Sequence, residues 1–291
     1  MNTPIIETAH LFPILHAKLV DLLRALEGPE WEMPTVAGMW RVKDVAAHLL
    51  DTQQRLVSRL RGEPASPPPP IRSNADLVAF IDRLNADGIR RYRRLDPSEL
   101  IALLEEGASV FADHHRSVDP WAEAPFGVSW AGEETSANWF HTAREFTERW
   151  HHQQQIRLAT AKPGIMTHEL YHPVLDCFMR ALPVAYRERA GANATYLRVN
   201  VAGDCGGTWY LFHHDSERPA SVDPVDGGSR PAWRLIASPV GKQIAETTIP
   251  QEIAWRLFTK GIGRDEARRQ LRVNGDAELG FHLLEAIAIV G

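Results

Sequence analysis

The sequence predicts an α-helical up-down bundle followed by a smaller α+β domain with an antiparallel sheet. Three observations support this. Apolar residues recur at helical spacing through the first half, Ala161-Lys162-Pro163-Gly164 interrupts the pattern, and alternating apolar and polar runs follow it. A length of 291 residues also fits about two domains. We therefore expect a bundle over residues 1–162 and the α+β domain over residues 166–291.

The bundle begins with two helices. Leucines at helical spacing predict the first over residues 7–27, and Gly28-Pro29 ends it. The second, over residues 41–61, has its valines and leucines on one side. It cannot continue into residues 63–70, where prolines favour a stiff, extended loop.

Three further signals place the rest of the bundle. Ser73 is a typical N-cap for a third helix, and Pro97 occupies the first turn of a fourth. A loop rich in Pro, Gly and Trp, residues 120–132, leads to a last helix that carries Glu148 and His152. Four or five antiparallel helices with such connections describe a bundle.

The second half mixes helices and strands. One helix is expected at about residues 170–188, and helical spacing returns near the C-terminus at residues 251–260 and 276–290. Gly-, Asp- and Pro-rich turns separate the strands, as in a meander. The expected strands cover residues 196–201, 208–212 and 232–236.

Composition excludes several classes of protein. With 44% apolar residues the chain can bury a sizeable core, and a net charge of −5 does not favour a nucleic-acid or anionic-membrane partner. No apolar run approaches the roughly 20 residues that span a bilayer, and no signal peptide is recognisable. The two cysteines, Cys177 and Cys205, lie far apart. A reduced, cytoplasmic protein without nucleic-acid or membrane partners is expected.

A candidate metal site combines two of these helices. Glu148 and His152 are four residues apart and therefore share one helix face. His48 lies on the second helix, at the border of its apolar side. One His from one helix and a Glu/His pair from another make a three-ligand set of the kind that a catalytic zinc uses, with the fourth position open.

Neighbouring polar residues are candidates for catalysis. His141 and Glu145 continue the stripe of Glu148 and His152 at spacings of four and three, and Arg55 follows His48 on its helix. His141 and Glu145 either line the pocket as acid/base groups or form a solvated end of the helix. The sequence leaves both readings open.

Other conspicuous residues have ordinary interpretations. The pairs His114-His115 and His213-His214 are interpreted as surface or loop residues, and His151 points about 100° away from His152. The basic run of residues 90–94 is a solvated helix end or, alternatively, a trap for an anionic ligand. Cys205 lacks a neighbouring base, so we do not expect it to be a nucleophile.

The segment from Trp40 to Leu50 resembles the W-x-V-x-D-V-x-x-H-L signature of the mycothiol-dependent maleylpyruvate isomerase N-terminal domain. That domain belongs to the DinB-like metal-binding bundles. Residues 148–152 fit the E-x-W-x-H half of the pattern, so the resemblance implies His48, Glu148 and His152 as metal ligands. Gln155 stands where family members often have Asp. The second half, around residues 203–209 and 274–276, is similar to a sterol-carrier-like domain.

The resemblance implies a divalent metal, with zinc expected, and a mycothiol-like low-molecular-weight thiol as cosubstrate. The chain would then be a thiol-using isomerase or S-transferase that acts on a small electrophilic or carboxylate substrate. Two alternatives remain: a non-catalytic metal- and ligand-binding protein, and a metal-assisted hydrolase with Glu145 as general base. The sequence does not decide the oligomeric state.

Overall fold

The computed structural model of the chain describes residues 5–64, 67, 69–214 and 233–289. Contacts divide the chain into two compact units, one of residues 6–124 with 137–174 and the other of residues 125–136 with 175–288. The division at residues 162–166 into separately folding domains stays a prediction, which limited proteolysis around residues 160–168 would test.

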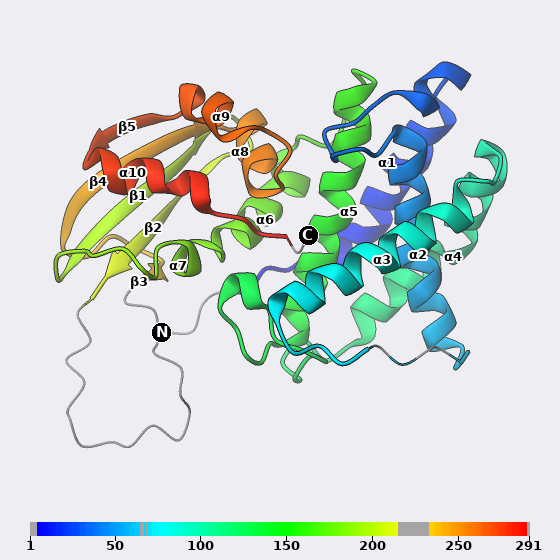
Figure 1. The fold of residues 1–291 in the computed structure, drawn as a ribbon, viewed down its shortest axis with the longest axis horizontal. Coiled ribbons are helices and arrows are strands. Elements are labelled where there is room, and N and C mark those ends of the chain that lie inside the picture. The colour runs from blue at the N-terminus through cyan, green and yellow to red at the C-terminus, as the bar shows by residue number, and fades with distance from the viewer. Residues whose placement is uncertain (1–4, 65–66, 68, 215–232, 290–291) are drawn as a thin grey trace. The chain divides into compact units, whose positions relative to one another are not determined.

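The first unit is a helical bundle, as predicted (Figure 1). The helix expected at residues 7–27 is shorter, because a 3₁₀ turn at Ala9–Leu11 precedes it and a second one at Gly28–Glu32 follows. The other boundaries lie within a few residues of the expected ones. The helices are α1 (Phe12–Arg24), α2 (Val42–Leu60), α3 (Asn74–Tyr92), α4 (Pro97–Ser117) and α5 (Asn138–Ala159).

The predicted helix starts are confirmed by their hydrogen bonds. The Ser73 hydroxyl accepts from the Asp76 backbone N–H at 3.1 Å, so it caps α3. At α4, the backbone N–H of Asp96 donates to the Glu99 carboxylate at 2.9 Å, and Pro97 occupies the first turn. Much of the proline loop before α3 is described, but residues 65, 66 and 68 lie outside the described part.

Two glycines on neighbouring helices make room for polar side chains of α2. A Cβ atom on Gly88 of α3 would lie 2.2 Å from the Asp51 carboxylate carbon, and one on Gly107 of α4 would lie 2.3 Å from the Gln53 amide nitrogen. The Gln53 amide also donates to the Leu104 backbone carbonyl at 2.9 Å. These two glycine notches let α3 and α4 pack closely against a helix that carries buried polar groups.

Helix α5 is buried on nearly all sides. Trp150 is fully buried and stacks on Tyr171 at 4.4 Å between ring centroids. Its indole N–H donates to the Ile165 carbonyl at 3.1 Å. Phe146 packs edge-on against Phe12 of α1. The polar face of α5 is therefore also an interior face, and its side chains need partners within the protein.

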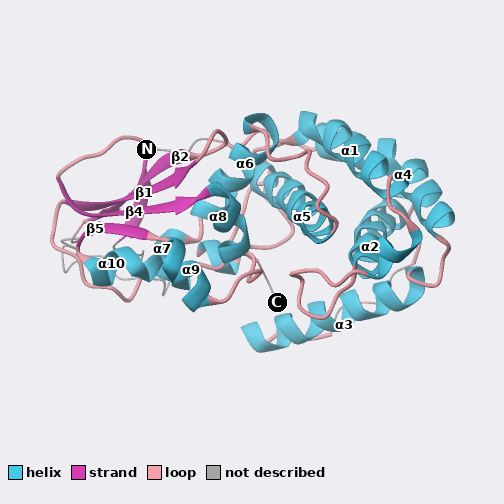
Figure 2. Ribbon diagram, turned by 90° about the horizontal axis from the view of Figure 1, so that it is seen from above, coloured by secondary structure: helices cyan, strands magenta, loops and turns pink. Residues whose placement is uncertain are grey.

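The second unit contains, among its described residues, a five-stranded sheet in the order β3-β2-β1-β4-β5. The apolar residues of the first strand alternate in burial as predicted. Figure 2 shows α7 and α10 on one face of the sheet. The strands are β1 (Thr195–Ala202), β2 (Gly207–His213), β3 (Trp233–Ile236), β4 (Lys242–Pro250) and β5 (Arg272–Gly275). Ala232, the expected start of the third strand, lies outside the described residues.

The sheet is mixed, which corrects the expectation of an antiparallel one. β1 and β4 are neighbours and run parallel, while the other pairs are antiparallel. A meander assumes that each strand pairs with the one before it in the chain, but β4 pairs with β1 instead of β3. Its buried positions hold Ala245, Thr247 and Ile249, a pattern with one large aliphatic residue that does not stand out as a strand.

The helices of this unit also differ in detail. The helix expected at residues 170–188 is two helices, because Pro183 has no N–H to continue the first. The helical stretch at residues 276–290 is also shorter, since α10 passes into a 3₁₀ turn at His282–Glu285. The remaining helices are α6 (His168–Met179), α7 (Leu182–Ala185), α8 (Gln251–Phe258), α9 (Arg264–Gln270) and α10 (Ala277–Phe281).

A search of the described helices found none that is both long and apolar enough to cross a membrane.

Candidate metal centre

His48 is positioned by the first turns of α2. Arg41 is the N-cap, and its backbone N–H donates to the Asp44 carboxylate at 3.0 Å, which satisfies one free group at the helix start. Asp44 in turn forms an ion pair with Arg93 at 3.2 Å. One turn further on, His48 is 2% exposed. A basic residue of the run at residues 90–94 thus anchors α3 to the start of α2.

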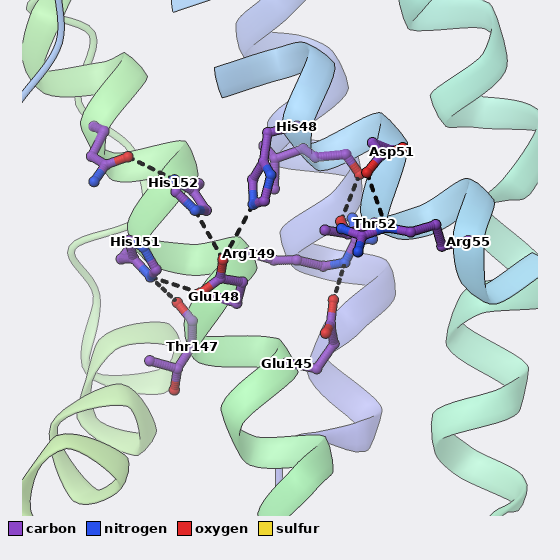
Figure 3. A network of polar contacts seen from close by, with 12 residues as sticks. His48, Asp51, Thr52, Arg55, Glu145, Thr147, Glu148, Arg149, His151 and His152 are labelled. Atoms are coloured by element: carbon purple, nitrogen blue, oxygen red, sulfur yellow. Dashed lines mark hydrogen bonds and ion pairs between the residues drawn. The ribbon is translucent and has the colours of Figure 1, made fainter. Parts of the chain in front are cut away.

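Glu148 and His152 come from α5 and meet His48 across the bundle (Figure 3). The Glu148 Oε1 atom lies 3.3 Å from His48 Nε2 and 3.0 Å from His152 Nε2. The three ligand atoms all lie within 4.8 Å of one another. The structure therefore brings together the three residues that the sequence singled out, although His48 and Glu148 are 100 positions apart.

Gln155 determines how the His152 ring is protonated. The His152 Nδ1 atom lies 2.7 Å from the Gln155 amide oxygen, which can only accept. Nδ1 therefore carries a proton, and whenever the ring has only this one, its Nε2 presents a lone pair toward Glu148 Oε1. Two electron-rich atoms at 3.0 Å repel each other unless a second proton or a metal ion lies between them. The Gln155 amide thus supplies a hydrogen-bond acceptor to His152, although it is not the Asp of the family pattern.

The donor set fits a metal ion by its dimensions. A tetrahedral zinc with nitrogen and oxygen ligands at about 2.0–2.1 Å separates those ligand atoms by about 3.3 Å. The two nitrogen–oxygen distances here, 3.3 and 3.0 Å, are close to that value. Three protein ligands leave one position for water or a substrate.

Burial and charge act differently on the three residues. Burial lowers the pKa of His48 to about 4, although the Glu148 carboxylate opposes the change, so this imidazole is neutral near pH 7. Burial raises the pKa of Glu148, but the charges of His152 and His151 and two imidazole hydrogen bonds outweigh it and hold that pKa well below its usual value. A neutral imidazole and an ionised carboxylate are the forms that bind metals.

Trp40 closes one side of the centre. Its ring centroid lies 4.9 Å from that of His48 and 5.7 Å from that of His152, and the second pair is stacked at 26°. The sequence pattern included this tryptophan but suggested no role for it. Its position at the start of α2, eight residues before His48, gave no sign that it would contact a residue of α5.

The candidate catalytic residues Glu145 and Arg55 lie on the same two helices (Figure 3). Arg55 forms an ion pair with Asp51 at 2.9 Å, and Glu145 forms one with Arg149 at 3.3 Å. Burial raises the pKa of Glu145, although the charge of Arg149 opposes the rise. His141 lies on α5 seven positions before Glu148 and is half-buried. No contact described here assigns a catalytic role to any of the three.

The interpretation of the two His pairs as surface residues is wrong for one member of each. His115 stacks on Phe12 at 4.6 Å, and burial lowers its pKa to about 3. His213 is 5% exposed and packs against Trp233. Both were misjudged because adjacent histidines on a helix or strand point in different directions, and one of them faces the interior.

His151 is also an interior residue. Its Nδ1–H donates to the Thr147 carbonyl at 3.0 Å, which directs this nitrogen into its own helix. Both cysteines are buried and free of disulfides, and burial raises the pKa of the Cys205 thiol. A raised thiol pKa disfavours the nucleophilic thiolate, in line with the expectation for Cys205.

Comparison with known proteins identifies the family. The family model for the mycothiol maleylpyruvate isomerase N-terminal domain matches residues 12–157, which is half of the chain. This range contains His48, Glu148 and His152.

No curated protein matches the sequence. Two solved structures are similar, those of the mycothiol-dependent maleylpyruvate isomerase and of a mutant of it. Each is 13% identical over 88% of both chains, with a TM-score of 0.47. On the match of its helical half, this chain belongs to the mycothiol maleylpyruvate isomerase N-terminal domain family.

Proposed function

We propose that the chain is a divalent-metal-dependent enzyme that uses a low-molecular-weight thiol, as an isomerase or S-transferase of the maleylpyruvate isomerase type. His48, Glu148 and His152 would hold the metal, and zinc suits this mixed ligand set. When bound, such an ion lowers the pKa of a thiol and so supplies a thiolate at neutral pH.

One observation carries the proposal. The first His152 proton is directed to Gln155, so in the neutral form of this ring two electron-rich atoms, His152 Nε2 and Glu148 Oε1, face each other at 3.0 Å. The neutral His48 ring approaches the same oxygen at 3.3 Å. A cation between these atoms would relieve their repulsion and use all three residues at once.

The proposed substrate is a small electrophile with an activated double bond and a carboxylate. In the isomerase reading, the thiolate sulfur bonds to one carbon of the double bond while the π electrons move to the conjugated carbonyl. Rotation about the resulting single bond follows. Expulsion of the thiolate then restores the double bond in the trans form. In the S-transferase reading, a proton reaches the carbon instead and the thioether is the product.

The candidate catalytic residues would serve these steps. The Arg55 side chain is 35% exposed and held by Asp51, so its remaining N–H groups suit the carboxylate of a substrate. The raised pKa of Glu145 suits a group that delivers a proton to carbon, and His141 is the second candidate for that step.

Metal-assisted hydrolysis is the second candidate function. It is favoured by the same raised pKa of Glu145, since raising the pKa of a carboxylate makes it a stronger general base for an attacking water. The ion pair between Glu145 and Arg149 argues against this role. The charge of Arg149 stabilises the ionised carboxylate and so makes it a weaker base.

The test begins with elemental analysis of the purified protein, where about one divalent ion per chain is expected. Cobalt is then substituted and thiols are added, and a thiolate-to-metal absorption band is expected. A screen of electrophiles with and without the thiol follows.

Absence of any bound ion under metal-replete conditions contradicts the proposal. A bound ion with no exchangeable position would leave a non-catalytic binding protein, and turnover of esters or amides without thiol would favour the hydrolase.

A further inference from the structure

Trp40 is held in a tight turn just before α2. Its backbone carbonyl accepts from the Thr35 hydroxyl at 2.7 Å and from the Thr35 backbone N–H at 3.1 Å. Its own N–H donates to the Ala37 carbonyl at 3.1 Å, and Pro34 and Arg41 pair across the base of the turn. These contacts fix the backbone from which the indole projects, so the ring position is defined before any metal binds.

The indole contacts two imidazoles that come from different helices. It lies 4.9 Å from the His48 ring of α2 and stacks at 5.7 Å on the His152 ring of α5. The two imidazoles are themselves 4.6 Å apart, nearly perpendicular. Trp40 also packs against the apolar core around α2. One residue therefore couples the orientation of both histidines to the packed interior of the bundle.

The two histidines differ in what else holds them. His152 Nδ1 donates to Gln155, and this hydrogen bond orients its ring. His48 Nδ1 is buried and has no hydrogen-bond partner among the described residues. Histidine ligands are usually oriented through their second nitrogen. For His48, ring packing must do this instead, and Trp40 supplies it.

We propose that Trp40 is a positioning residue of the metal centre, which orients His48 and His152 and thereby sets the affinity for the ion. The inference rests on the proposed metal site. A metal-bound imidazole carries more positive charge than a free one, and the electron-rich face of an indole attracts such charge. Trp40 thus favours the metal-bound form beyond the packing that it provides in the metal-free protein.

The experiment measures zinc and cobalt affinity by competition with a chelator in the full-length protein. Residues that orient metal ligands typically contribute 10–100-fold to affinity. Trp40→Leu is therefore expected to weaken binding by about 10–100-fold. Trp40→Phe keeps an aromatic face and is expected to restore part of this loss. Trp121→Phe is the matched control, because Trp121 is 63% exposed, and its affinity should equal that of the wild type.

Fluorescence gives a second readout that does not depend on activity. Cobalt quenches an indole at short range, so cobalt should quench part of the wild-type emission, and Trp40→Phe should lack that part. Trp121→Phe should keep it. This readout also holds if Trp40→Leu fails to fold, because Trp40→Phe changes the side chain conservatively.

The outcomes separate the two proposals. If the wild type binds no ion, the proposed function fails. If the wild type binds zinc and both Trp40 variants bind it as tightly as the wild type does, the metal centre stands and the proposed role of Trp40 is refuted. If Trp40→Phe binds as weakly as Trp40→Leu and shows the same cobalt quenching as the wild type, the aromatic contact is likewise refuted.

Discussion

Helix α5 has two polar faces that adjoin where Glu145 continues the stripe of Glu148 and His152, and the polar groups of the two faces are stabilised in different ways. On one face, Glu148 and His152 direct acceptor atoms toward the same point as His48. On the other, Arg149 forms an ion pair with Glu145, and its guanidinium lies 3.7 Å from the centre of the Phe111 ring. The first face gathers electron-rich atoms, and the second pairs a cation with an anion and an aromatic ring.

The second face also borders a small cavity. Arg149, Gln153 and His16 line a space of about 10 Å³ between α1, α4 and α5, which is room for about one water molecule. Both amide atoms of Gln153 are buried without a protein partner among the described residues. A water molecule can both donate and accept, so it suits this mixed lining, whereas the first face suits the proposed cation. The polar residues of one helix thus divide into a structural face, held by its own ion pair, and a proposed metal-binding face.

The largest expected effect concerns the structural face. Glu145→Gln would leave the Arg149 charge buried without its counter-ion. Breaking a buried ion pair costs about 3–5 kcal/mol, and the lower end, about 3 kcal/mol, applies because Glu145 is 29% exposed. Urea unfolding of the metal-free protein measures this loss, and zinc affinity of the folded variant should be close to wild type. A variant of unchanged stability would show that the pair does not hold the bundle.

The matching change on the other face is Glu148→Gln, which should have the opposite profile. The carboxylate both neutralises and anchors a divalent ion, and an amide is neutral and a poorer ligand. We expect affinity for zinc to fall by at least about 100-fold, which is about 2.7 kcal/mol. The stability of the metal-free protein should change little. Chelator competition measures the affinity, and wild-type affinity in this variant would remove Glu148 from the metal site.

Two half-buried histidines beside the structural face predict a dependence of stability on pH. Burial lowers the pKa of His115 to about 3 and that of His16 to about 4, whereas both titrate near 6.5 when unfolded. The unfolded state therefore binds more protons below pH 6.5. Their contribution to stability is complete above that pH and is lost as the pH falls toward 3–4.

At pH 5 each of these two histidines lowers the free energy of unfolding by about 2 kcal/mol relative to pH 7. His115→Phe keeps the ring contact with Phe12 and removes the proton site. Urea unfolding with a chelator present, at pH 7 and pH 5, should show a loss that is smaller in the variant than in the wild type by about that amount. Identical losses in the two proteins would mean that His115 is not protonated on unfolding in this range.

Two glutamines give the smallest and most direct comparison, because they lie two residues apart on α5 and are both buried. Gln155→Met removes the acceptor of the His152 proton, so zinc affinity should fall by about 10-fold. Gln153→Met removes unpartnered amide atoms from the cavity on the other face and should leave zinc affinity unchanged. Equal zinc affinities in the two variants would contradict the division of the helix into two faces.

The sequence predicted the bundle well because its signals are local. Helical spacing, the Ser73 cap and the proline at position 97 each act within one or two turns, and the structure has the helices they indicate. The spacing of Glu148 and His152 likewise placed them on one face. That His48 would join them is a contact over 100 positions, which no local spacing shows; the ligand types suggested it, and the resemblance to a family supported it.

What the sequence missed depends on tertiary contacts. β4 carries a buried Thr247 whose hydroxyl donates to the Gly280 carbonyl at 2.8 Å, so a polar residue serves as a core residue. The proposed role of Trp40 depends on α2 and α5 lying side by side. His115 was judged by its neighbour His114 and not by Phe12 of α1, whose ring stacks on it. In each case the partner that decides the role is distant in the sequence.

The two glycine notches that α3 and α4 present to α2 have a consequence for how this family can diverge. The Asp51 side chain fills the space where a side chain on Gly88 would lie, and the Gln53 side chain does the same at Gly107. Any side chain placed on either glycine must therefore displace a polar group. A substitution at position 88 or 107 therefore becomes acceptable only together with a shorter residue at 51 or 53. Among homologous sequences, positions 51 and 88 should change together, as should positions 53 and 107. Selection therefore acts on each pair of positions and not on a single residue.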